Sequence, residues 1–588
     1  MWNLQNLSST ARFVRSFSTI SVSKSKRHHF FKDPNSSYLQ IYNDSLNLKF
    51  FNEQKFIEFD GEYTCRKSME NFTFEIDGYL NAAYNCIDRH PSERAAIYWE
   101  TNEINSNKAA NTMTYGELLS FVSQLSNTLI DMGIQKGDRV GICAGQTPYS
   151  IIAMLACARI GAIHVVVFAG FSSEAIRERL SNAKAKVVIC TDIGKHGTKT
   201  IPIFETMSNA LPTCVEKVII AIRPNSIQEL KNVHFGPNFD NTALIKAKLF
   251  VSPHLDNNKC VFWDEVVVKQ RTYCPPAKLH AEEPLFILHT SGSSGHPKGL
   301  LHSTGGYLMA AAYSTKFVFD LQENEVLGCM ADCGWVAGHT FMVYGPLALG
   351  ATTVLFEPTP VYPTPSRYSD CVKKWNINTL FTAPTAIRVL KKHNKETGNL
   401  LNTSCKVLGC AGEPINPDAW QYYKNEFGSN QCEVVDTYWQ TETGSVLLSP
   451  IPYVTPTKPG SACLPFLGIS PKLVDVDTHE VIEGNNVEGM LAISEPWPSM
   501  ARTIWGDHQR FLKTYFKNKM YITGDTAFRD EDGYYWIRGR IDDMVNVAGH
   551  RLSTAEVEAA LAKHPDCIES ASIGIPDGLT GQAVITIY

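Results

Sequence analysis

The sequence has no uninterrupted apolar run long enough to cross a membrane. The longest apolar stretch, residues 151–170, is broken by Arg159 and His164, whereas a spanning helix needs about 20 predominantly apolar residues. A hydrophobic fraction of 44% over 588 residues is typical of a globular protein with substantial cores. We therefore expect no membrane partner.

The sequence also lacks the cysteine spacing of a metal or redox centre. None of its 16 cysteines forms a C-x-x-C pair, and Cys329 and Cys333 are four residues apart in an apolar stretch. We interpret the cysteines as reduced side chains of hydrophobic cores. A net charge of −5 argues against nucleic acid as a partner, so local basic groups must bind any anionic substrate.

Acidic residues are missing from the first 32 positions. This segment is rich in serine and in basic residues, which is the composition of a mitochondrial transit peptide. The stretch 15–18, RSFS, also looks like a presequence cleavage site. We predict that residues 1–32 are a transit peptide and that the protein resides in the mitochondrial matrix. The alternative is that these residues are a basic tail without a targeting signal and that the protein is cytoplasmic.

The remaining chain alternates between helical and strand patterns. Thr114 begins an amphipathic helix, a second helix is expected over 150–158, and residues 223–260 read as a surface excursion. Such alternation predicts an α/β fold with mostly parallel sheets covered by helices. The expected strands are 139–143, 162–168, 186–190 and 217–222.

The segment 285–299, LFILHTSGSSGHPKG, places an apolar strand before a loop of glycine, hydroxyl and lysine residues. Thr290 and Ser291 offer hydroxyls, the glycines let backbone N–H groups approach a polyphosphate, and Lys298 adds a positive charge. It is not a Walker A loop, because only two residues separate the first two glycines and a proline precedes the lysine. An ordinary turn is the alternative when the loop is taken alone.

Further motifs follow in a fixed order. They are GCAGEP at 409–414, DTYWQTETG at 436–444, YITGD at 521–525 and RGRIDD at 538–543, together with GDRVGIC, GWVAGH and NVAGHRLSTAEVE. On these residues the chain resembles the adenylate-forming superfamily, and within it the AMP-forming acetyl-CoA synthetases, from about Tyr84 to the last residue.

The resemblance implies a fold and an activity. The fold is a large multi-layer domain, residues 33–541, followed by a small α+β domain from residue 542, with Asp542 at the hinge and assigned a catalytic part for that reason. The activity is ligation of acetate to CoA, first with ATP to give acetyl-AMP and pyrophosphate, then with CoA to give acetyl-CoA and AMP. The implied substrates and cofactors are ATP, CoA, Mg²⁺ and a small carboxylate.

The resemblance also assigns the nucleotide site. Asp525 and Arg540 would hold the ribose, Arg551 the phosphate, and Glu442 the Mg²⁺ ion, which prefers hard oxygen donors. The residues expected to wall the adenine and orient the α-phosphate are Gly412, Glu413, Pro414, Asp436, Thr437, Tyr438, Trp439, Gln440 and Thr441.

By resemblance, Trp439 closes the acyl pocket and excludes long acids. Ala411 and Ala337 stand where the acetate enzymes usually carry valine and threonine. The space released would fit about one more carbon, worth roughly 0.8 kcal/mol per buried CH₂, and one methylene can discriminate substrates by about 10- to 200-fold. A preference for propionate is therefore an alternative to acetate.

The resemblance assigns CoA to the loop that contains His196, Gly197, Thr198 and Lys199, where relatives carry two arginines. Lysine binds phosphate as a point charge and neutral histidine contributes less, so weaker CoA binding is expected. Ala548 and Gly549 would line the tunnel for the pantetheine arm.

Relatives continue with a P-K-T-R-S-G-K segment whose lysine contacts the reacting groups, and residues up to Tyr588 do not include it. We therefore expect residues 542–588 to be an incomplete small domain, with an unpaired strand at 583–588. A non-catalytic nucleotide binder is the alternative from another function class. The sequence does not indicate an oligomeric state.

Overall fold

The computed structural model describes residues 37–53, 55–103, 107–235, 242–251, 253, 256, 258–290, 297–547, 550–561, 564, 567, 570–577 and 581–587. The predicted transit peptide lies outside these residues. Within the described ranges, no helix is long and apolar enough to cross a membrane.

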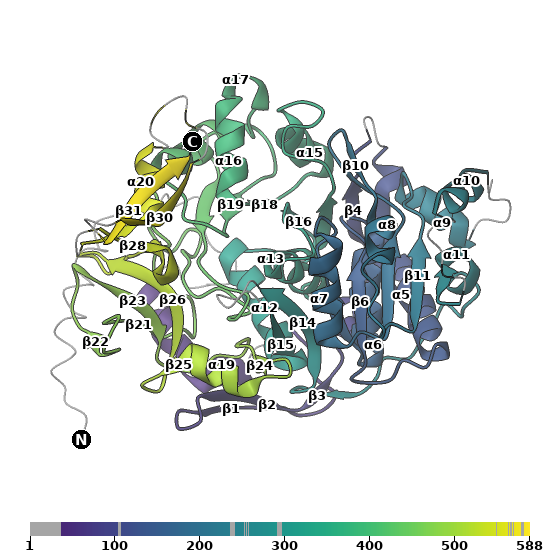
Figure 1. Cartoon of the computed structure of the whole chain (residues 1–588), viewed down its shortest axis with the longest axis horizontal. Helices are drawn as coiled ribbons and strands as arrows, with labels where there is room; N and C mark the ends of the chain where they lie inside the picture. The colour runs from purple at the N-terminus through teal and green to yellow at the C-terminus, as the bar shows by residue number, and fades with distance from the viewer. Residues whose placement is uncertain are drawn as a thin grey trace.

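An eight-stranded sheet forms one side of the molecule (Figure 1). Its first six strands are parallel, and the last two run antiparallel to their neighbours. This confirms the predicted strands and the mostly parallel sheet. The strands, in spatial order, are β12 (Cys260–Phe262), β11 (Lys217–Ala221), β8 (Val187–Thr191), β6 (Arg139–Cys143), β7 (Ile163–Val166), β14 (Pro284–Thr290), β15 (Lys298–Ser303) and β24 (Thr503–Ile504).

A seven-stranded sheet forms the second layer and is parallel except at one edge, where β4 and β5 pair antiparallel. Because its other strands all point the same way, their carboxyl ends and the loops after them meet at one edge. The strands, in order, are β20 (Glu433–Asp436), β19 (Val407–Cys410), β18 (Thr379–Thr382), β16 (Val326–Cys329), β17 (Thr352–Phe356), β4 (Ala95–Glu100) and β5 (Thr112–Thr114).

The helices begin and end where the local sequence dictates. Helix α5 (Tyr115–Asp131) starts with the Thr114 and Glu117 capping box, in which each side chain accepts from the other residue's backbone N–H. Helix α6 (Pro148–Ile160) carries apolar residues around its whole circumference, and all of it, including Arg159, is buried. The predicted surface excursion contains two helices, α9 (Ile227–Phe235) and α10 (Thr242–Val251).

A third, antiparallel sheet follows the two parallel layers. It consists of β22 (Val481–Ile482), β21 (Pro471–Val474), β23 (Val487–Ile493), β26 (Met520–Arg529) and β25 (Phe516–Lys517), and β27 (Tyr535–Arg540) also pairs with β26. Figure 1 shows it on the side opposite β11.

The C-terminal unit lies beside this third sheet, in yellow in Figure 1. It contains α20 (Thr554–Leu561) and a sheet of β29 (His550–Ser553), β28 (Met544–Val547), β31 (Gly581–Ile587) and β30 (Ala571–Asp577). The expected unpaired strand at 583–588 is wrong for its described residues, because β31 lies between β28 and β30 and pairs with both.

Candidate active site

The loops at the carboxyl edge of the seven-stranded sheet surround a cavity of about 890 Å³. Each of five neighbouring parallel strands contributes to its wall, which is where open α/β sheets bind ligands. The lining residues include Asp332 after β16, Pro358 after β17, Thr385 after β18, Ala411 after β19 and Trp439 after β20.

A second cavity, of about 500 Å³, adjoins the first. Most of the predicted nucleotide residues line it, namely Gly412, Glu413, Pro414, Asp436, Thr437, Tyr438, Trp439, Gln440, Asp525 and Arg540. The C-terminal unit contributes Thr554, Glu558 and Ser572 to the same cavity. Gly412, Glu413, Trp439 and Gln440 line both cavities, so the two spaces share one wall.

Asp525 is the centre of a hydrogen-bond cluster in the second cavity. It lies directly opposite Arg540 in the pairing of β26 with β27, and the Arg540 Nε is 3.7 Å from its Oδ1. The Tyr438 hydroxyl and the Gln440 amide, at 2.6 Å for the amide, donate to its Oδ2. Burial nevertheless raises the pKa of the Asp525 carboxyl. The sequence motifs 436–441 and 521–525 are thus brought together by direct contact.

Asp436 ends β20 at the floor of the second cavity and is only 6% exposed. Within the described ranges, its side chain accepts one hydrogen bond, from the Cys410 thiol, whose sulfur is 3.6 Å from Oδ1. Burial raises the pKa of the Asp436 carboxyl to about 7, because a low-polarity surrounding disfavours the charged form.

Glu413 is held by two residues to which the sequence reasoning gave no role. The backbone N–H of Thr385 donates to its Oε1 at 2.7 Å, and the Thr385 hydroxyl donates to the same oxygen. Arg388 donates to Oε2 at 2.9 Å. Both partners lie in α16 (Pro384–Lys392), and no local sequence pattern connects them with Glu413.

The phosphate loop closes a β-hairpin, since Thr290 and Lys298 are register partners at the ends of β14 and β15. An antiparallel strand rather than a helix follows the loop, which confirms that it is not a Walker A motif. Lys298 is buried, and burial lowers the pKa of its ammonium group, although the negative charge of Glu442 acts in the opposite direction. Ser291 lies outside the described residues.

A tyrosine joins this lysine to the predicted magnesium ligand. The Lys298 Nζ is 2.7 Å from the Tyr515 hydroxyl, which donates to the Glu442 Oε1 at 2.6 Å, and Lys298 and Glu442 are 3.8 Å apart. Tyr515 ends α19 (His508–Tyr515) and no sequence signal pointed to it. No group of three or more His, Cys, Asp or Glu side chains in the described ranges could hold a metal ion, so Glu442 stands as a single carboxylate.

The loop that carries Gln440, Thr441 and Glu442 is fixed from behind. The His302 ring is buried, with Nε2 2.9 Å from the Thr441 carbonyl and Nδ1 3.0 Å from a second backbone carbonyl. Gly444 has a φ of +68°, and a side chain there would overlap the backbone and the His302 ring. The loop is therefore preorganised.

The predicted acyl residues lie together in the larger cavity. Ala337, Ala411 and Trp439 all line it, and the Trp439 ring packs edge-on against Phe341 with centroids 5.2 Å apart. The tryptophan is held by a packed aromatic neighbour, so the closed end of the pocket is rigid.

The predicted CoA loop is a small hairpin of β9 (Gly194–His196) and β10 (Lys199–Ile201). Asn102 holds its tip by accepting from the Gly197 N–H at 3.0 Å and donating to the Gly197 carbonyl at 2.8 Å. His196 lines the larger cavity, whereas Thr198 and Lys199 are exposed.

The predicted hinge lies where the third sheet meets the C-terminal unit. Asp542 is in the short helix η6 (Ile541–Asp543), is exposed, and lies 3.8 Å from Arg540. Arg551 belongs to β29. Ala548 and Gly549 lie outside the described residues.

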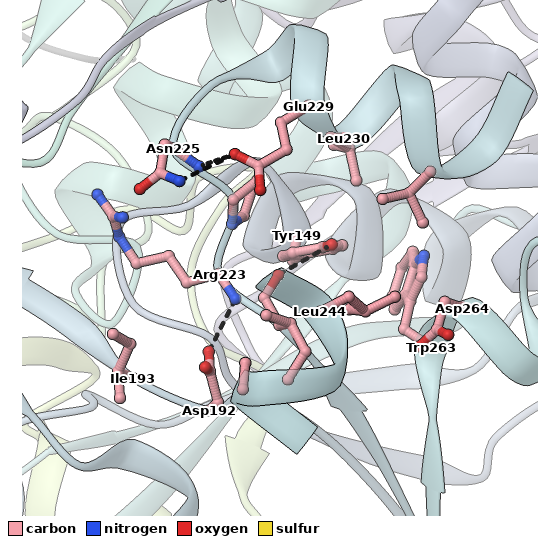
Figure 2. Close-up of a pocket in the computed structure, with 14 residues that line it drawn as sticks. Tyr149, Asp192, Ile193, Arg223, Asn225, Glu229, Leu230, Leu244, Trp263 and Asp264 are labelled. Atoms are coloured by element: carbon pink, nitrogen blue, oxygen red, sulfur yellow. Dashed lines mark hydrogen bonds between the residues drawn. The ribbon is translucent and has the colours of Figure 1, made fainter. Parts of the chain in front are cut away.

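A third cavity, of about 200 Å³, is separate from this site (Figure 2). Its wall includes Tyr149, Asp192, Arg223 and Trp263, and no residue of the motifs lines it. The backbone N–H of Arg223 donates to the Asp192 carboxylate at 2.7 Å.

Comparisons with known proteins agree with this geometry. The family model described as "AMP-binding enzyme" matches residues 84–505. The chain is 48% identical to an acetyl-coenzyme A synthetase of Coprinopsis cinerea over 86% of this chain and 74% of that one. It is 42% identical to acetyl-coenzyme A synthetase 2 of Saccharomyces cerevisiae, over 96% and 82%. The crystal structure of Brucella canis acyl-CoA synthetase superposes with a TM-score of 0.66 at 25% identity, covering 87% of this chain and 84% of that one.

Proposed function

The chain belongs to the AMP-binding enzyme family and, within it, to the acetyl-coenzyme A synthetases, and from this premise we propose that it is an AMP-forming acetate–CoA ligase. The observation that carries the proposal is the shared wall of the two cavities at Gly412, Glu413, Trp439 and Gln440. A nucleotide in one cavity and a small acid in the other would meet at this wall, as acyl-adenylate formation requires.

The first half-reaction replaces a poor leaving group with a good one. An acetate oxygen attacks the α-phosphorus of ATP, the bond to the β-phosphate oxygen breaks, and pyrophosphate leaves. The protein contributes by positioning the two reactants and by stabilising the developing charge. Lys298, drawn toward Glu442 and Tyr515, is the described cation best placed beside the phosphate loop.

Different residues of the second cavity would bind the ribose and the base of the nucleotide. The Asp525 carboxylate, held by Tyr438 and Gln440, would accept hydrogen bonds from the ribose hydroxyls, with Arg540 beside it. Asp436 is buried in the cavity floor. A buried carboxyl there suits a hydrogen bond with the neutral adenine base better than a contact with a phosphate.

Magnesium fits one carboxylate at this site. Glu442 would hold it, because Mg²⁺ takes one or two carboxylates and completes its shell with substrate phosphates and water. When bound, it would neutralise phosphate charge. Tyr515 and Lys298 already orient the Glu442 oxygen, so the carboxylate would change partners rather than conformation.

The acid is acetate. The rigid Trp439 ring against Phe341 closes the pocket, and the relatives reported above are named for acetate. Neither a preference for propionate nor a non-catalytic nucleotide binder is favoured, although Ala337 and Ala411 line the cavity as expected.

We also propose import into the mitochondrial matrix, on the composition of residues 1–32 alone. A fluorescent protein fused behind these residues should enter mitochondria. Diffuse cytoplasmic fluorescence would contradict the proposal.

Pyrophosphate release from the full chain tests the activity. With ATP and Mg²⁺, release should depend on acetate, should be slower with propionate, and slowest with butyrate. CoA should convert the intermediate to acetyl-CoA and AMP. An absence of acetate-dependent release would refute the proposed function, and faster release with propionate would refute acetate as the preferred acid.

A further inference from the structure

Asp332 lies in the loop between β16 and α13 (Val336–Gly338), on the wall of the larger cavity. Ala337, Ala411 and Trp439, which form the acyl end, line the same cavity, and His196 of the CoA hairpin lines it too. A thiol brought from the hairpin side to an acyl group beside Trp439 would therefore enter the space that Asp332 faces. No motif used above assigns this aspartate a role.

The Asp332 carboxylate is unusually poor in partners. Its Oδ1 accepts one hydrogen bond, from the Gly334 N–H at 2.7 Å. Among the described residues, no lysine, arginine or histidine forms an ion pair with it. Glu413 and Asp525, by contrast, each lie beside an arginine. One Asp332 oxygen is thus left to accept a proton from something that enters the cavity.

The surroundings leave Asp332 as the available base. Burial raises the pKa of the Asp332 carboxyl to about 6, so it is mostly ionised at neutral pH. The thiols of Cys143 in β6 and of Cys333 on the same loop feel its charge, and burial raises the pKa of both. Across the cavity lie the titratable groups of His196, Tyr368 and Glu413, the last paired with Arg388.

We propose that Asp332 is the general base of the thioester-forming half-reaction, an inference that rests on the proposed function. The CoA S–H proton passes to the free Asp332 oxygen as the sulfur bonds to the acyl carbon. The bond from that carbon to the AMP phosphate oxygen breaks, and AMP leaves as an anion. Asp332 then returns its proton to water. A base is useful because a free thiol, with a pKa of about 8.5, is only a few per cent ionised at pH 7.

The Asp332→Asn substitution removes the ionisable carboxylate while keeping the size and the hydrogen bond of the side chain. The amide oxygen can still accept from the Gly334 N–H, so the loop keeps its hydrogen bond, while the basic carboxylate is lost. The assay supplies acetyl-adenylate and CoA to the full chain and measures single-turnover acetyl-CoA formation against pH. We expect a fall of about 10²- to 10⁴-fold and loss of the low-pH limb that the unaltered chain shows near pH 6. Asp332→Glu should restore part of the rate and the limb.

Acetate-dependent pyrophosphate release without CoA, measured in parallel, should change far less. Asp192→Asn is the matched control, because Asp192 also accepts a backbone N–H at 2.7 Å, burial also raises its pKa, and it faces the separate cavity of Figure 2. It should leave both half-reactions unchanged.

Two results would overturn the inference. One is an Asp332→Asn transfer rate and pH profile equal to those of the unaltered chain. The other is an equal loss of both half-reactions, which indicates a structural role. Failure of the unaltered chain to release pyrophosphate or to form acetyl-CoA would instead contradict the proposed function itself.

Discussion

Asp436 should make the protein less stable as the pH rises, and Asp436→Asn should remove that loss. Burial raises the pKa of this carboxyl to about 7 from an ordinary value of 3.8. The folded protein therefore keeps a proton that the unfolded chain has released between about pH 4 and pH 7. The free energy of unfolding falls as the pH rises through that interval, and the loss is complete above pH 7.

The magnitude follows from the pKa difference. Each pKa unit corresponds to about 1.4 kcal/mol, and the carboxyl is 6% exposed, so water screens it little. The full loss is on the order of 4 kcal/mol. With about 2.1 cal/mol/K of unfolding entropy per residue, this corresponds to about 3 °C in Tm for a chain of 588 residues that unfolds as one unit.

The assay is thermal unfolding of the chain and of Asp436→Asn between pH 5 and pH 8. Only about two of the three pKa units lie between pH 5 and pH 7, so the Tm of the variant should rise relative to the parent by about 2 °C across this range, on top of any constant offset. Asp477→Asn, at an exposed turn, is the control and should show no such trend. A Tm difference that stays constant with pH would refute the assignment of a raised pKa to Asp436.

Three further substitutions probe the site. Tyr515→Phe removes the hydroxyl between Lys298 and Glu442. Because a hydrogen bond to a charged group is worth about 1.5–3 kcal/mol, kcat/KM for ATP should fall about 10- to 100-fold. An unchanged kcat/KM would contradict a role for this hydroxyl in positioning Lys298 and Glu442. Gly444→Ala forces a side chain into a backbone position with φ of +68° and should lower both Tm and kcat, whereas unaltered kinetics would show that the loop tolerates movement. His196→Arg places a permanent charge at the cavity wall and should lower the KM for CoA several-fold with kcat unchanged; no improvement would count against a phosphate contact there.

The parallel layers and the nucleotide residues could be predicted from the sequence because local patterns of residues determine both. Capping at Thr114 and apolar runs such as Val187–Thr191 determine their elements without distant help. The motif residues 412–414 and 436–440 then lie together because each follows the carboxyl end of a parallel strand.

What the sequence could not predict depends on contacts between distant residues. Tyr515 reaches Glu442 across 73 positions, and Arg388 reaches Glu413 across 25, and neither has a local pattern. The pairing of β31 on both sides was missed because strand order is not visible in a short apolar run. The partner-poor environment of Asp332 is likewise a property of the folded loop alone.

The contribution of Thr554, Glu558 and Ser572 to the nucleotide cavity has a kinetic consequence. A nucleotide in this cavity would contact both the main body and the C-terminal unit, so we expect the residence time of AMP to depend on movement of that unit as well as on contact strength.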